Sequence, residues 1–313
     1  MSSMNGSGLK STGAARSDRG SVDWPTLLLV IACYGVWWLG VGWFSALWLP
    51  LGILITTLSV TLHSSLQHEV LHGHPTHRRW LNETLVFLPV GLLFPYGRFR
   101  DTHLAHHQDE FLTDPYDDPE TNFQDPAVWA RLSLPHRALL LFNNSLAGRM
   151  LVGPLVSGVC FIGGDMRAIR RGDRAILRDW LLHLVGLVCL GWLLQRASMP
   201  GWAYVLSAYI GLSILKIRTY LEHRAHEIAR CRTVIIEGGH ILPFLFLNNN
   251  LHAVHHAKPG LAWYRLPALY RERKEEFLRR NDGYSYASYA EVFRRYFLRA
   301  KDPVPHPLWT KDQ

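Results

Sequence analysis

Histidine is the residue type whose spacing in this sequence could form a chemically active site. His68 and His72 lie four residues apart in HEVLH, and the segments HLAHH and HAVHH each contain histidines at positions i, i+3 and i+4. Residues three and four apart share one face of a helix, so the imidazoles of each segment can point at one place. The two triplets are His103, His106 and His107, and His252, His255 and His256. Together these segments predict a shared metal site.

The number of these imidazoles predicts two metal ions rather than one. Zinc takes about four protein ligands, or about three plus a water at a catalytic site. The three segments supply eight histidines, and His223 in LEHRAHE adds a ninth. His226, three residues later, is the alternative for that ninth position. Imidazole binds zinc, copper, iron and nickel, so the ligand type leaves the metal open.

Two other functions compete with a shared site. His68-Glu69-x-x-His72 also spells the HExxH motif of zinc proteases, in which the glutamate is the base. That interpretation leaves both triplets without a role. A histidine-rich metal transporter is the second alternative. Transporters place ionisable residues near mid-membrane, whereas the histidine segments here lie beyond the apolar runs. His63 and His183 stand alone in apolar runs and are expected to be core residues.

The elements that must position these histidines are membrane helices. A span takes about 20 mostly apolar residues. We expect an all-α integral membrane protein, with four transmembrane helices in two hairpins and a cytoplasmic helical cap that carries the histidine segments. The expected spans are residues 26–48, 50–67, 180–196 and 201–217. Residues 84–97 and 150–164 are shorter apolar runs broken by Pro or Gly, which favours an interfacial position.

Charge and composition set the orientation. The net charge is +8, and the segment between the two hairpins contains RAIRRGDRAILR, whereas the loop ASMPG has no basic residue. The positive-inside rule therefore predicts that both termini and the histidines are cytoplasmic. No basic, aromatic-rich nucleic-acid module is present, and the four cysteines are too scattered for a thiolate site. Residues 1–22 are predicted to be a flexible tail before one domain at 23–313.

The order HExxH, HxxHH, a lone His and HxxHH, together with two apolar hairpins, resembles the membrane fatty acid desaturase and hydroxylase superfamily. The likeness covers about residues 24–270 and includes NNNLHAVHHAKPGLAWYRLP around the last triplet. It implies a non-haem diiron enzyme that uses O2 and reducing equivalents to desaturate a fatty acyl or other lipid-like chain. A hydroxylase or hydrocarbon monooxygenase of the same superfamily is the alternative. The iron ligands it implies are His68, His72, His103, His106, His107, His223, His252, His255 and His256.

Further residues are expected around the ligands. Neutral imidazoles leave the charge of two ions unbalanced, and nearby carboxylates could accept the second N–H of each ring. The resemblance places Thr219 where acyl-CoA desaturases have an asparagine close to one iron. The acidic stretch at 108–120 is expected to be mainly a solvated loop. The carboxylate candidates are Glu69, Asp101, Asp109, Glu222 and Glu227.

Electrons are expected from a separate protein. The sequence contains no HPGG-like cytochrome b5 module and no CxxC redox motif. A ferredoxin or rubredoxin is the expected donor, and the basic cytoplasmic surface could dock an acidic carrier. The bacterial inner membrane is the expected location.

Overall fold

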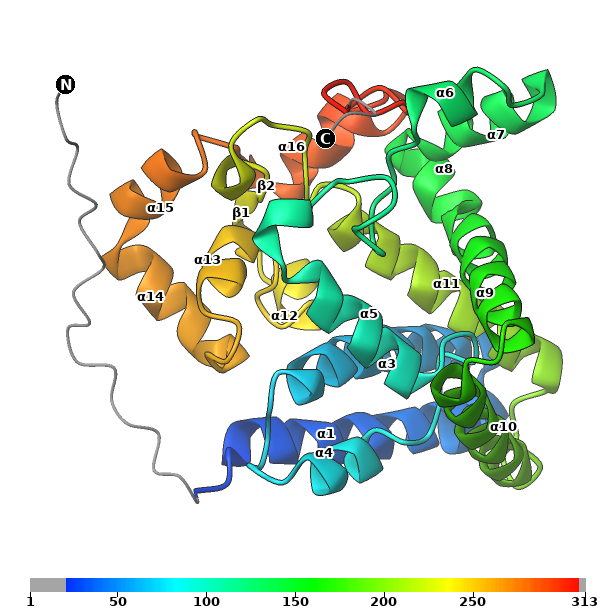
Figure 1. The fold of residues 1–313 in the computed structure, drawn as a ribbon. Coiled ribbons are helices and arrows are strands. Elements are labelled where there is room, and N and C mark those ends of the chain that lie inside the picture. Colours follow the sequence, from blue (N-terminus) through cyan, green and yellow to red (C-terminus); the bar gives the residue numbers. More distant parts are fainter. Residues whose placement is uncertain (1–20, 310–313) are drawn as a thin grey trace, which may run out of the picture.

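Helices dominate the computed structural model, which describes residues 21–309 (Figure 1). The predicted flexible tail therefore lies almost wholly outside the described residues. Three helical stretches are long and apolar enough to cross a membrane, which makes this a membrane protein. They are Trp24–Leu47, Leu49–Leu71 and Arg174–Leu194.

The first two stretches form a tight hairpin. Asp23 and Pro25 begin the first helix, because the aspartate side chain accepts the N–H of Thr26 and proline suits a first turn. The chain reverses at Trp48, whose backbone is extended. A side chain at Gly52 would collide with Ser45, so the two helices could not meet this closely without glycine. The elements are α1 (Trp24–Leu39), the π-helical η1 (Gly40–Phe44), α2 (Ser45–Leu47) and α3 (Leu49–Leu71).

Helix α3 is longer than its predicted span of 50–67. It continues to Leu71, and His72 caps its C-terminus. The apolar segment and the first histidine segment are therefore one rigid element. This continuity fixes His68 at the end of the membrane hairpin.

The second predicted hairpin consists of α10 (Arg174–Leu194) and α11 (Gly201–Thr219). The side chain of Asp173 caps α10 by accepting two backbone N–H groups. Helix α11 packs along α3, where a side chain at Gly211 would come within 2.8 Å of Val60. Only α10 of this pair is among the three candidate spans. A membrane-spanning α11, and thus the fourth span, stays a prediction.

The two runs expected at the interface adopt different structures. Residues 84–97 include the end of α4 (Arg79–Leu85), irregular turns and the start of α5 (Tyr96–His106). Residues 150–164 fall mostly in α9 (Gly153–Arg170), which follows α8 (Leu146–Leu151). Their depth in a membrane stays a prediction.

The cap departs from the all-α prediction through a small parallel sheet. Strand β1 (Ile235–Gly238) pairs with β2 (Ser285–Ser288), and Ile236 lies in a buried apolar cluster with Phe246 and Val292. Two strands of four residues are too short to show an alternating pattern in the sequence. The short helix α12 packs on α3, α13 contacts α14, and α14 contacts α15 (Figure 1). The remaining elements are η2 (Asp109–Phe111), α6 (Pro126–Trp129), α7 (Leu134–Asn143), η3 (Ala229–Cys231), α12 (Ile241–Leu245), α13 (His252–Ala257), η4 (Trp263–Arg265), α14 (Leu266–Glu272), α15 (Lys274–Arg280) and α16 (Tyr289–Tyr296).

Candidate metal centre

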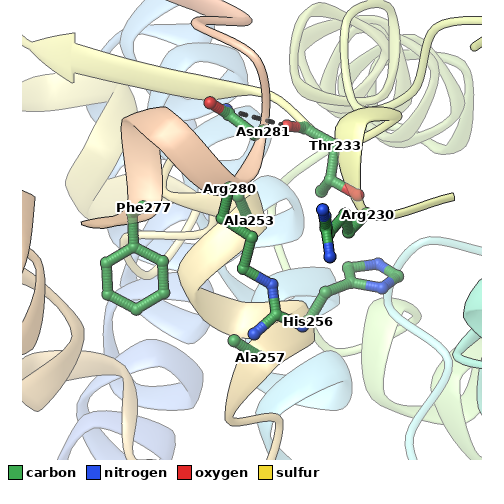
Figure 2. A pocket seen from close by; sticks show the side chains of 8 residues that line it. All are labelled: Arg230, Thr233, Ala253, His256, Ala257, Phe277, Arg280 and Asn281. Atoms are coloured by element: carbon green, nitrogen blue, oxygen red, sulfur yellow. Dashed lines mark hydrogen bonds between the residues drawn. The ribbon is translucent and has the colours of Figure 1, made fainter. Parts of the chain in front are cut away.

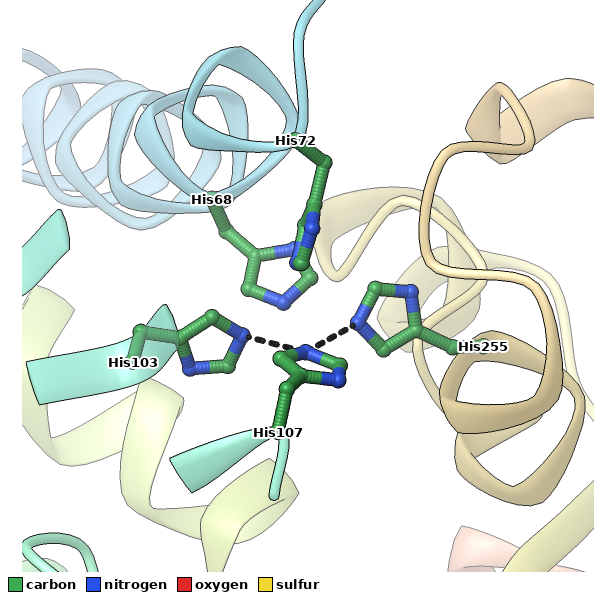
Figure 3. A group of neighbouring side chains, drawn as sticks. All are labelled: His68, His72, His103, His107 and His255. Carbon is green, nitrogen blue, oxygen red and sulfur yellow. Dashed lines mark hydrogen bonds between the residues drawn. The ribbon is translucent and has the colours of Figure 1, made fainter. Parts of the chain in front are cut away.

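The nine histidines expected to be ligands converge in two groups. Within each group, one ring nitrogen per residue lies within 4.8 Å of all the others. Figure 3 shows the rings of the larger group pointing toward one another. The five-histidine group contains His68, His72, His103, His107 and His255. The four-histidine group contains His106, His223, His252 and His256.

Each HxxHH triplet is divided between the two groups, which the sequence did not predict. In α5 and its cap, His103 and His107 join the five-histidine group while His106 joins the other. In α13 the division is reversed, since only His255 joins the five-histidine group. Neighbouring helical residues point about 100° apart at 3.6 residues per turn. Positions i+3 and i+4 can therefore serve two different ions.

The spacing of ring nitrogens fits bound metal ions. The Nε2 atom of His107 lies 3.0 Å from that of His103 and 3.1 Å from that of His255. In the other group, His223 Nε2 lies 2.9 Å from the Nε2 of His106 and 3.2 Å from that of His252. Metal–nitrogen bonds of about 2.1 Å place adjacent ligands on one ion roughly 3 Å apart. Each group thus has the spacing of an imidazole set around one ion.

Two buried ring nitrogens of the five-histidine group lack a partner that a metal ion could supply. Among the described residues, Nε2 of His68 and Nε2 of His72 have no hydrogen-bond partner. A buried polar atom without a partner costs about 1–3 kcal/mol and calls for an explanation. A metal ion at the centre of the five-histidine group would accept both lone pairs.

The protonation states also suit ligands. Burial, followed by repulsion from His103 and His256, lowers the pKa of His72 to about 2. Burial and neighbouring imidazoles likewise lower the pKa values of His107 and His255. A neutral imidazole keeps the lone pair that a metal needs. His72, His107 and His255 therefore keep their lone pairs available for a metal ion.

The comparison with family models identifies the class of protein. The model described as fatty acid desaturase matches residues 45–288. The chain belongs to the fatty acid desaturase family. It is therefore an oxidoreductase, and the two histidine groups correspond to the diiron site that is typical of the family. No individually curated protein matches the sequence.

Two carboxylates of the acidic stretch at 108–120 form hydrogen bonds with candidate ligand histidines. His103 Nδ1 donates to Glu120 Oε1 at 2.9 Å, and His106 Nδ1 donates to Asp118 Oδ1 at 2.7 Å. The expectation of a solvated loop does not hold for these two residues. Burial alone would lower the pKa of His106, but Glu120 and Asp118 outweigh it and raise that pKa to about 9. Both rings direct Nε2 inward as a result.

An amide and a carboxylate support the last triplet. The Nδ1 atom of His252 lies 3.0 Å from Asn249 Oδ1, and Asn249 Nδ2 donates to Glu222 Oε1 at 3.4 Å. Glu222 forms a buried ion pair with Arg218 at 2.9 Å. The predicted role of Glu222 is thus indirect, through Asn249. Sequence reasoning missed Asn249, although it lies in the NNN run just before the triplet.

Glu69 contacts no ring of either group. It accepts the backbone N–H of Trp263 at 2.9 Å and lies 3.7 Å from His74 Nε2. His74 in turn pairs with Asp23 at 2.8 Å, so these residues join the start of α1 to the end of α3. This arrangement holds the first histidine segment in place without touching its ligands.

The other predicted neighbours of the ligands lie elsewhere. Asp101 is exposed and pairs with Arg100. Glu227 is exposed, and the side chain of Asp109 lies outside the described residues. The hydroxyl of Thr219 is buried and has no hydrogen-bond partner within the described chain. Of the three whose side chains the structure describes, Thr219 alone keeps an unexplained buried polar atom.

The remaining histidines divide as follows. His223 lies in the four-histidine group, whereas His226 accepts the N–H of Ile228 at 3.0 Å and is not in either group. His63 is buried and hydrogen-bonds to the hydroxyl of Tyr34 at 2.9 Å. His183 is buried and donates to a backbone carbonyl at 2.9 Å. The last two are core residues, as their isolation predicted.

A small cavity lies beside His256 of the four-histidine group (Figure 2). His256 forms part of its wall, and the side chains of Arg230 and Arg280 reach toward that ring. The cavity is therefore a positively charged opening beside a candidate ligand.

Proposed function

We propose that this protein is a membrane-bound diiron oxidase that uses O2 and reducing equivalents to desaturate a fatty acyl or other lipid-like chain. The observation that carries the proposal is the pair of adjacent groups of imidazoles in a fatty acid desaturase family member. A zinc protease would leave His103, His107 and His255 without a role around His68 and His72.

The nine histidines would hold two iron ions, five imidazoles at one and four at the other. Imidazole is a good ligand for iron, and the unpaired nitrogens of His68 and His72 fit that purpose. Bound iron supplies the activation of O2 that removal of hydrogen from an unactivated C–H bond requires. The chain's own residues fix the orientation of His103 and His106 through Glu120 and Asp118 and bury the site away from water.

The substrate class follows from where the groups lie. His68 and His72 end the helix α3, which is itself apolar enough to cross a membrane. A chain that reaches these residues along α3 would come from the lipid phase. We infer a lipid-like substrate, with alkene or alcohol as the product that distinguishes a desaturase from a hydroxylase.

The topology that we propose has four spans, with α11 as the fourth. Helix α11 packs along α3 and ends just before the segment with His223. The basic segment between α9 and α10 supports a cytoplasmic position for both termini and the histidines. We propose a single domain at 23–313 in a bacterial inner membrane.

Electrons would come from a ferredoxin or rubredoxin. The cavity lined by Arg230 and Arg280 lies against His256, so an acidic carrier docked there would be close to the four-histidine group. Opposite charges across an interface increase the rate of encounter.

Reconstitution tests the proposal. The purified protein, loaded with iron and supplied with a reduced donor and a panel of lipids, should contain about two irons per chain, consume O2 and yield an alkene. The double variant His68→Ala/His72→Ala should fold but consume no O2. One zinc per chain, or no O2 uptake with any lipid despite full iron loading, would contradict the oxidase.

A further inference from the structure

The chain after α16 forms a strap of residues 297–306 that is attached at two places. Near its start, Arg299 O accepts a hydrogen bond from the hydroxyl of Tyr220 at 3.1 Å, just after the end of α11. Near its end, Val304 O accepts the backbone N–H of Gln124 at 2.9 Å. The middle of the strap is therefore fixed between these two contacts.

Lys301, in the middle of the strap, has a largely buried side chain that is 10% exposed. Its Nζ atom donates to the backbone carbonyl of His223, and to the hydroxyl of Tyr284 at 3.2 Å. Asp302 Oδ2 lies 3.1 Å from the same nitrogen and offsets its charge. Burying an ammonium costs free energy unless it is paired and hydrogen-bonded. These contacts therefore hold the ammonium against His223.

The backbone of His223 leaves its carbonyl free for this contact. His223 lies opposite Thr233 in an antiparallel bridge. The hydrogen bonds on either side of this bridge are made by the neighbouring residues, at 2.9 and 3.1 Å. In such a pair, the two facing residues exchange no backbone hydrogen bonds. Within the described chain, the donor to the His223 carbonyl is the ammonium of Lys301.

The ring of His223 has no outer hydrogen bond to fix its direction. Its Nδ1 atom is buried and has no partner among the described residues. In contrast, Nδ1 of His103, of His106 and of His252 each contacts a carboxylate or an amide. Helix α11 ends at Thr219, so His223 does not lie on a helix either. The direction of this ring therefore depends on how its backbone is held.

We propose that Lys301 is a positioning residue of the metal centre: by holding the backbone carbonyl of His223, it directs Nε2 of that ring into the four-histidine group. The inference rests on the proposed diiron function. Lys301 lies outside residues 45–288, the part of the chain that matches the desaturase model. It forms no hydrogen bond or ion pair with a described residue of the five-histidine group. Its effect is therefore expected at one group and not at the other.

Lys301→Met removes the donor while nearly keeping the length of the side chain. Lys274→Met removes an exposed lysine from α15 and is the matched control. Each variant is made in full-length protein in two backgrounds, one without the five-histidine group and one without the four-histidine group. The backgrounds are His68→Ala/His72→Ala and His106→Ala/His252→Ala, respectively. Co2+ binding is followed by its absorption spectrum.

In the first background, Lys301→Met is expected to lower Co2+ affinity by about 10-fold, with Lys274→Met unchanged. In the second background, Lys301→Met is expected to leave Co2+ affinity unchanged. Unaltered binding in the first background would overturn the inference. An equal loss in both backgrounds would also overturn it, because it would show a general effect on folding.

Iron-57 Mössbauer spectra of the protein with all nine histidines give a second measurement. Lys301→Met should alter the signal of one iron, and spectra identical to the parent would overturn the inference. A parent protein that binds two irons and oxidises lipid despite that result leaves the proposed function standing. A parent that consumes no O2 would contradict the proposed function, whereas the Co2+ comparison would still decide the role of Lys301.

Discussion

Asp118 Oδ1 lies 2.7 Å from Nδ1 of His106, and both side chains are buried. The carboxylate fixes which nitrogen of the ring carries the proton and which one faces the other histidines. His106 is a candidate ligand whose orientation depends on a residue twelve positions later in the chain.

Asp118→Ala should therefore weaken metal binding without removing a ligand. Loss of such a hydrogen-bond partner typically lowers metal affinity or activity by about 10–100-fold. Iron content after dialysis against a graded chelator measures the effect, and Asp117→Asn provides the control. Retention of iron equal to that of the parent would show that the ring is held by other contacts.

Metal removal should destabilise the fold. The two groups join α3, α5, α13 and the segment after α11, so an ion in each binds the folded state and not the unfolded chain. Ligand at about 100 times its dissociation constant stabilises a protein by about 2.7 kcal/mol. Thermal unfolding in detergent should thus occur at lower temperature after chelation. The His68→Ala/His72→Ala variant should show a smaller difference, whereas an unchanged melting temperature in the parent would contradict metal-linked stability.

His223 and His226 should respond differently to substitution. His223→Ala removes a member of the four-histidine group and should abolish O2 uptake and reduce iron below two per chain. His226→Ala should leave both unchanged, because its ring accepts a backbone N–H and belongs to neither group. The paired variants are compared for iron content and O2 consumption. Equal losses in both would mean that His226 takes part in the site.

The sequence predicted which residues converge but not how they are divided. Helical spacing identified His103, His106 and His107 as one set, yet the structure assigns His106 to a different group. The division depends on where α5 sits relative to α13, which is a tertiary property. Asp118 and Glu120 were misjudged for a similar reason. The acidic composition and the prolines of the stretch at 108–120 are typical of exposed loops. Only the fold shows that this stretch turns back onto α5.

The apolar runs predicted three of the spans well because about 20 consecutive apolar residues leave few alternatives. They could not show that α3 continues through His68, since a change from apolar to polar residues marks the end of a membrane segment and not the end of a helix. The pairing of Ile235 with Ser285 joins segments fifty residues apart, and no local pattern reveals it.

The pairing of Glu83 with Arg100 should make stability depend on pH. Partial burial raises the pKa of Glu83, but hydrogen bonds from Arg79 and Arg100 outweigh it, and the net pKa lies below the usual value of 4.5. A lowered carboxyl pKa contributes stability above pH 4.5 that disappears as the pH falls through the folded-state value. Glu83→Gln should cost no more than about 1 kcal/mol at pH 7 and nothing in strong acid. Unfolding curves at both pH values test this, with the exposed Glu272→Gln as control. A difference that persists in acid would assign the effect to packing.

Reversing charge at the cavity beside His256 should weaken reduction by an acidic carrier. The double variant Arg230→Glu/Arg280→Glu places two carboxylates where two guanidinium groups now face the opening. Because interfacial charges act mainly on association, the KM for a reduced plant-type [2Fe–2S] ferredoxin should rise by about 10-fold or more at low salt. The difference should shrink as salt screens the charges.

Two controls separate docking from other effects. Reduction by dithionite needs no docking and provides the reference rate. Arg171→Glu, on the exposed end of α9, makes a matched change in charge away from the cavity and should leave the KM unaltered. An equal rise in KM for both charge reversals would point to net charge rather than to docking at this cavity.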